Sequence, residues 1–160
     1  MNSLISGALA GFAATVPMTV AMEGMHKLLP PRQQYPLPPR LITENVADAA
    51  GIDDALDEKE TTSLTFFNHF AYGAATGALY SAAVCRFSKP TVLNGIGFGL
   101  GIWLVSYEAA LPLAGILSPA HEHPPQRNAL MIAAHVVWGA SLGMILSSLT
   151  NGKPEKQLNI

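Results

Sequence analysis

The stretch ALMIAAHVVWGASLGMILSSL, residues 129–149, decides the fold of this chain. It contains no Asp, Glu, Lys or Arg, and His135 is its only side chain that titrates near neutral pH. A bilayer has a hydrocarbon core about 30 Å thick, which a helix of about 20 apolar residues can cross. The stretch has this length and is apolar on every side, so we expect it to form a transmembrane helix.

Three other stretches have the same character. Residues 4–22 carry no charge, residues 66–85 contain only His69 as a group that titrates near neutrality, and residues 91–117 contain one charge. The sequence therefore predicts an all-α, polytopic membrane protein with four transmembrane helices in a single domain, 1–150. A soluble four-helix bundle is the alternative, but its helices would carry a charged outer face at helical spacing.

The composition narrows the classes of function further. The 160 residues include 9 Lys and Arg against 11 Asp and Glu, so no basic surface is available for nucleic acid. The single Cys excludes a disulfide framework and any paired-cysteine site. Most of the acidic residues lie within a polar, proline-rich loop, 24–63, in which a short interfacial helix is expected over residues 41–56. A polar tail, 151–160, ends the chain.

An internal repeat links the second and fourth predicted helices. HFAYGAATG (69–77) and HVVWGASLG (135–143) both fit the pattern H-x-x-aromatic-G-A-x-x-G. We therefore expect two tandem helix hairpins, roughly 1–88 and 89–150, that share one orientation. Small residues four apart let helices approach closely in lipid. The predicted packing glycines are Gly7, Gly11, Gly73, Gly77, Gly97, Gly101, Gly139 and Gly143.

Ionisable residues within the predicted helices are the first candidates for a site, because a charge in hydrocarbon is expensive and needs a partner. His69 and His135 each precede a packing glycine by four residues, and Glu108 follows Gly101 by seven. All three are therefore expected on the inner faces of their helices, in one cluster. The candidate ligand- or proton-binding residues are His69, His135, Glu108, Tyr72, Trp138 and Glu23.

Three interpretations of this cluster stay open. The histidines bond across helices and hold the bundle together, or they form a proton- or ion-binding site. The third is a metal- or haem-dependent redox site that uses His69, His135 and Glu108. A separate, weaker metal site for zinc or copper is conceivable from His26, His121 and His123. The sequence contains neither the motif of a catalytic serine nucleophile nor that of a phosphate-binding loop.

Several of these motifs resemble one family. GALAGFAATVPMT (7–19), the Pro-Pro loop, HFAYGAATGALY (69–80) and HVVWG (135–139) look like the YagU-like group of small bacterial inner-membrane proteins. The resemblance implies a multi-pass protein of the bacterial inner membrane without an assigned reaction, in a group linked with acid tolerance. It implies no catalytic residues.

These observations favour a non-enzymatic inner-membrane protein whose buried His/Glu cluster binds a proton or ion or docks a partner. A structural accessory subunit of a larger membrane complex is the further alternative, and a homo-oligomer suits either role. Both termini are expected in the cytoplasm, because Arg86, Lys89, Lys153 and Lys156 lie in short segments on that side.

Overall fold

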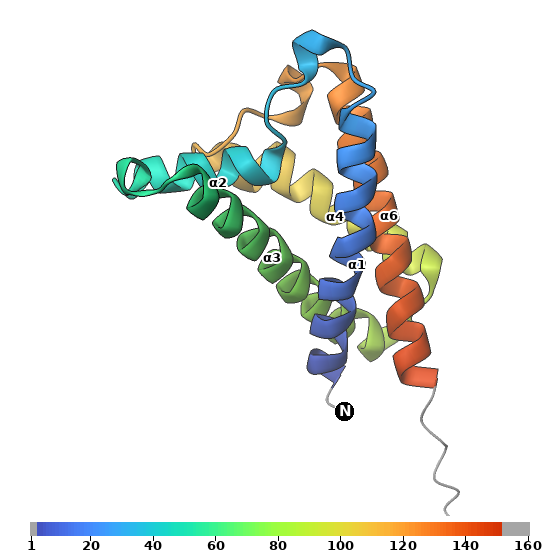
Figure 1. The fold of residues 1–160 in the computed structure, drawn as a ribbon. Helices are drawn as coiled ribbons and strands as arrows, with labels where there is room; N and C mark the ends of the chain where they lie inside the picture. The colour runs from blue at the N-terminus through green and yellow to red at the C-terminus, as the bar shows by residue number, and fades with distance from the viewer. Residues whose placement is uncertain (1–2, 152–160) are drawn as a thin grey trace, which may run out of the picture.

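The computed structural model describes residues 3–151, and all regular elements in this range are helical (Figure 1). The long helices are α1 (Ser3–His26), α3 (Glu58–Phe87), α4 (Val92–Val105) and α6 (Pro125–Asn151). The shorter elements are η1 (Pro31–Gln33), α2 (Pro38–Ala49), η2 (Asp53–Ala55), the π-helix η3 (Ser106–Ala110), α5 (Leu111–Leu113) and η4 (Ala120–Glu122). Apart from Asn151, the predicted polar tail lies outside the described residues.

Within the described residues, three helical segments are long and apolar enough to cross a membrane. They are Ser3–His26, Val92–Leu113 and Pro125–Thr150, and the second of them combines α4, η3 and α5. They indicate that the chain is a membrane protein. The fourth predicted span, in α3, is not among them. Polar residues of α3 such as Asn68, His69 and Thr76 lower its average hydropathy.

The long helices pair unequally. α1 packs against both α3 and α6, and α4 packs against α6, whereas the backbones of α3 and α4 come close at few positions. Figure 1 shows α1 and α6 running side by side, with α3 and α4 sloping away from them. The start of α1 and the end of α6 lie at one end of the molecule, and the loops that contain η1 and η4 lie at the other.

Glycines make the contact between α1 and α3. A Cβ added to Gly11 would overlap the carbonyl oxygen of Gly73 and lie 2.8 Å from the Cα of Gly77. A Cβ on Gly7 would collide with Ser81 and with the carbonyl of Gly77. The two backbones therefore touch, and dispersion between them replaces the hydrophobic drive that lipid cannot supply.

The contact between α4 and α6 is built in the same way, but from two glycines that differ from the expected pair. Gly95 and Gly99 lie against the backbone of Gly139, whereas a Cβ on Gly97 or Gly101 would meet no atom of residues 3–151 within 4 Å. The assignment of Gly97 and Gly101 to this packing face is therefore corrected. The sequence GIGFGLG (95–101) offers two overlapping small-residue pairs, and spacing alone does not say which one faces α6.

α2 lies across the end of α3 that is near the loops (Figure 1). It begins at Pro38, where proline suits the first helical turn, and Gly51 follows it with a positive φ of 68°. The side chain of Arg40 binds Glu44 and also Glu58 of α3, with 2.7 Å between Arg40 Nη2 and Glu58 Oε2. These bonds raise the pKa of Arg40 and lower that of Glu58, and they hold α2 on α3.

Candidate functional site

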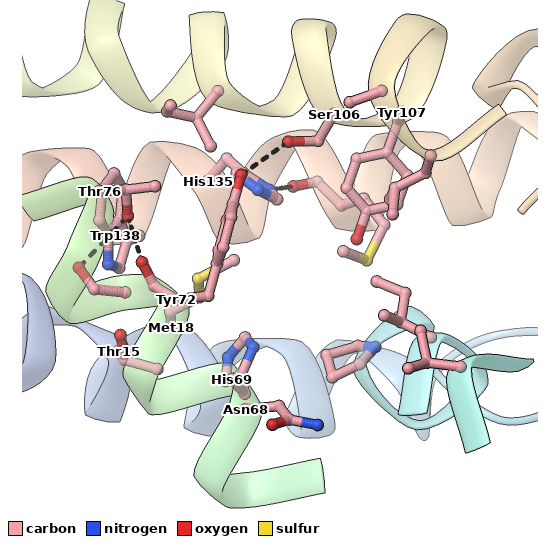
Figure 2. Close-up of a pocket in the computed structure, with 18 residues that line it drawn as sticks. Thr15, Met18, Asn68, His69, Tyr72, Thr76, Ser106, Tyr107, His135 and Trp138 are labelled. Carbon is pink, nitrogen blue, oxygen red and sulfur yellow. Dashed lines mark hydrogen bonds between the residues drawn. The ribbon is translucent and has the colours of Figure 1, made fainter. Parts of the chain in front are cut away.

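A pocket of about 440 Å³ lies between α3 and α4 (Figure 2). α1 and α6 contribute Thr15, Met18, Met131, His135 and Trp138 to its lining. α2 contributes Pro39, Ile42 and Val46, and the rest of the lining comes from α3 and from the segment α4–η3–α5. The wall is mostly apolar, as is typical of sites for small molecules. The pocket exists because α3 and α4 diverge where no glycine joins them.

His135 of α6 lies in the wall of this pocket and is 6% exposed. Its Nδ1 lies 2.8 Å from the carbonyl oxygen of Met131, one turn earlier. Because a carbonyl oxygen only accepts, Nδ1 carries the proton, and in the neutral ring Nε2 is then an acceptor. The ring of Tyr107 packs edge-on against His135, with 6.0 Å between the ring centroids. The orientation of the imidazole is therefore fixed from two directions.

His69 of α3 lines the same pocket. Its Nε2 is buried and has no hydrogen-bond partner within the described part of the chain. A buried polar atom without a partner costs about 1–3 kcal/mol and calls for an explanation. Figure 2 shows both imidazoles beside the same space. The sequence predicted that the two histidines share one site, and the structure brings them together with Tyr72 and Trp138.

The aromatic residues of the pocket join its walls. The hydroxyl of Tyr72 on α3 lies 3.0 Å from the hydroxyl oxygen of Ser106, the first residue of η3. The indole of Trp138 donates to the carbonyl oxygen of Gly11 on α1, at 3.3 Å. A wide π turn precedes Pro112, which lacks the N–H of a regular helix and whose ring crowds the preceding turn.

Glu108 does not join the histidines. Its carboxylate accepts from the backbone N–H of His121 at 3.1 Å, and Oε2 lies 2.8 Å from Nδ1 of the same residue. The ion pair raises the pKa of His121, which is exposed in η4. The expected His/Glu cluster is thus corrected. Glu108 follows Gly101 by two turns, and Gly101 does not belong to the face that packs on α6.

The expected metal site of His26, His121 and His123 does not form, since the three side chains have different partners. His26 donates to the carbonyl oxygen of Tyr35 at 3.2 Å, and His123 Nδ1 lies 3.4 Å from the Tyr35 hydroxyl. His121 binds Glu108. Within residues 3–151, no group of three or more His, Cys, Asp or Glu side chains is placed to hold a metal ion.

Glu23 also lies apart from the main pocket. It is exposed near the end of α1 and borders a smaller hollow of about 160 Å³ that α1, α2 and α3 enclose. His69 and Pro39 border both this hollow and the main pocket.

Arg127, which no sequence motif indicates, organises the loop end of the molecule. This side chain is 5% exposed and donates to three carbonyl oxygens of the loop between α1 and α2, those of Gln33, Tyr35 and Pro36, at 2.7–3.0 Å. Its guanidinium also lies 3.6 Å above the ring of Tyr35. An arginine beside Pro-Pro carries no signal for such contacts, because its acceptors are backbone atoms of a distant loop.

The fold and the pocket define a class, namely a small helical membrane protein with a ligand-sized pocket inside its helix bundle. A family model described as "Protein of unknown function (DUF1440)" matches residues 17–144, so the chain belongs to this family. The comparisons with curated proteins and with solved structures gave no match. The name of the YagU-like group and an origin in a bacterial inner membrane stay predictions.

Proposed function

We propose that this chain is a non-enzymatic membrane protein that binds a small, mostly apolar molecule carrying a hydrogen-bond donor. The pocket between α3 and α4 is the binding site. The observation that carries this proposal is that two imidazoles, the half-buried His69 and the buried His135, line one mostly apolar pocket of about 440 Å³, and that Nε2 of His69 has no partner among the described residues. Sites for small molecules usually measure about 300–1,000 Å³ and combine apolar walls with a few polar groups.

The tautomer of His135 selects the polar group of the ligand. With Nδ1 committed to Met131, its Nε2 presents a lone pair. A hydroxyl group or a protonated acid supplies the matching proton. Bonding to such a group is most favourable away from water, where an unpaired polar atom is costly.

A neutral ligand fits the pocket better than a cation does. Of the described residues, no Asp or Glu lines it, and Glu108 is bound to His121 instead. A cation taken into hydrocarbon needs a compensating charge, and none is within reach there. We therefore propose a neutral ligand in place of the proton or ion that the sequence suggested.

We propose α3 as a fourth membrane span. α3 packs along α1, which is long and apolar enough to cross, through Gly73 and Gly77. Its polar side chain Thr76 is buried beside the pocket, and Asn68 and Tyr72 line the pocket with a side-chain hydrogen-bond partner each. Four spans place the loops that contain η1 and η4 on one side of the membrane and both chain ends on the other, which we assign to the cytoplasm.

We also propose that the two hairpins are repeats. In each, two glycines of the first helix meet two glycines of the second, and a histidine precedes the first of the latter by four residues. His69 and His135 are then equivalent positions, and the pocket collects both copies of one motif.

The proposal is tested by fluorescence of Trp138, which lines the pocket. Trp103→Phe leaves it as the only tryptophan, and bromine quenches an indole that it contacts. The protein in phospholipid vesicles is titrated with a terminally brominated long-chain alcohol and with its methyl ether, which lacks the donor. We expect the alcohol to reach half-maximal quenching at a concentration lower by about fivefold to tenfold, the worth of one hydrogen bond.

Two variants test whether His135 causes the preference for the alcohol. His135→Leu removes the acceptor, so the alcohol and the ether should become equal. His121→Leu, which removes a histidine outside the pocket, should keep the preference. Equal quenching by the two probes in the parent protein would contradict recognition of a donor.

A metal or haem between the two histidines is the second candidate. The observation in its favour is the same pair of imidazoles with available ring nitrogens, without Glu108. A Soret band or a stoichiometric transition metal in the purified protein, lost in His135→Leu, would favour it over the apolar ligand.

A further inference from the structure

α2 covers the pocket on the side of the loops. Ile42 and Val46 of α2 form part of its wall there. The amide of Asn45 donates to the carbonyl oxygen of Ile116 at 2.6 Å, which ties α2 to the segment that follows α5. The amide of Asn68 lies 3.4 Å from the hydroxyl of Thr43, which ties α2 to α3. α2 is therefore attached both to α3 and to the segment that follows α5, and it hinders entry of a molecule from the water on this side.

The remaining side of the pocket lies between α3 and α4. α1 and α6 close the opposite side because they pack against each other, whereas the backbones of α3 and α4 come close at few positions, and the rings of Tyr80 and Phe98 pack between them with 5.1 Å between the ring centroids. The hydrogen bond between the hydroxyls of Tyr72 and Ser106 crosses this gap (Figure 2). Tyr72 is 52% exposed, and Leu79, which is two turns further along α3, is similarly exposed. In a helix that crosses a bilayer, such exposed apolar surface faces lipid.

We propose that the ligand enters sideways from the bilayer, between α3 and α4, and that the Tyr72–Ser106 hydrogen bond is the gate. This inference rests on the proposed function and specifies the class of ligand. The occupant is a molecule dissolved in the membrane, such as a long-chain alcohol or a neutral fatty acid, and not a solute taken from water. One hydrogen bond holds the gate, so the pocket opens when Tyr72 turns away from Ser106.

The test is the rate of Trp138 quenching by the brominated alcohol in vesicles, followed by stopped flow in the Trp103→Phe protein. Tyr72→Phe keeps the ring and removes its hydroxyl. Loss of one neutral hydrogen bond should raise both the association and the dissociation rate by about fivefold. Ser106→Ala should do the same, and the double variant should be no faster than either single variant, because both break the same bond.

Asn45→Ala is the matched control, because it removes the hydrogen bond between α2 and Ile116 and leaves the gap between α3 and α4 unchanged. We expect the rates of this variant to equal those of the parent. If Asn45→Ala accelerates quenching while Tyr72→Phe and Ser106→Ala do not, the ligand enters from the side of the loops and the inference is overturned. If the alcohol does not quench Trp138 saturably in any variant, the proposed function itself fails.

Discussion

The interface between α1 and α3 and the gap between α3 and α4 are two opposite solutions in one molecule. In the first, Gly11 and Gly73 leave no room for a Cβ, and the backbones touch. In the second, Tyr72 and Ser106 reach each other only through their side chains, and a pocket opens behind them. Glycine positions therefore decide which helix faces pack closely together. Polar and aromatic side chains gather where two helices stay apart.

The largest effect is expected when a side chain is added at the glycine interface between α1 and α3. In Gly11→Ala, the new methyl group would overlap backbone atoms of Gly73 and Gly77, which cannot turn away as a side chain can. We expect a loss of about 3 kcal/mol in the free energy of unfolding, at the upper end of overpacking effects. Thermal unfolding of the detergent-solubilised protein measures it.

Gly97→Ala is the control for this variant. The added methyl group meets no atom of the described chain, so stability should stay the same or rise slightly with helix propensity. A loss as large as that of Gly11→Ala would mean that this face of α4 packs on another copy or on a partner subunit.

A smaller loss is expected when the loops at the end of the pocket are released. Arg127→Met removes the donor of three carbonyl oxygens and should cost about 2 kcal/mol. Arg32→Met, an exposed arginine of the same loop region, removes the same charge and should change little. Equal melting temperatures of the two variants would show that the buried guanidinium does not fix the loops.

A further prediction concerns the stability of the protein when His69, in the wall of the pocket, is replaced. Its Nε2 is buried without a partner among the described residues, so His69→Leu should raise the free energy of unfolding by about 1 kcal/mol. The same variant should weaken binding of the brominated alcohol, since the group left unpaired is one that a ligand uses. A destabilised His69→Leu protein would show that the imidazole has a structural role in the empty pocket.

The smallest effect concerns His121, outside the bundle. Glu108 raises its pKa, so the ion pair contributes to stability below the ordinary histidine pKa, and this contribution is lost as the pH rises through the raised value. Glu108→Gln should lower the pKa of His121 towards the ordinary range, as measured by an NMR titration. Glu122→Gln should lower it less, because Glu122 acts only through a weaker charge interaction. An unchanged pKa in Glu108→Gln would show that the pair does not form.

Most of the helical fold was predictable because lipid imposes a simple rule on composition. Residues 129–149 and 4–22 fall within helices long enough to span, and the two histidines line one pocket, each four residues before a packing glycine. The span in α3 stays a proposal, since the polar residues that line the pocket also weaken the apolar signal.

The errors have one physical source, which is the choice of helix face. The stretch 95–101 contains two glycine pairs. Assigning Gly97 and Gly101 to the packing face led to the wrong prediction that Glu108 lies on the same side as the histidines. Only the position of α6 resolves the choice. The contacts of Arg127 were unpredictable for another reason, because backbone carbonyls exist at every residue and a sequence does not indicate which of them converge.

The most direct test of the account compares the two tryptophans. Proteins that retain only Trp138, which lines the pocket, or only Trp103, which does not, are titrated in vesicles with the brominated alcohol. We predict that quenching of Trp138 saturates and is relieved by an unbrominated alcohol of the same length, whereas quenching of Trp103 rises in proportion to the alcohol in the bilayer. Proportional quenching of both tryptophans, without competition, would contradict a binding site between α3 and α4.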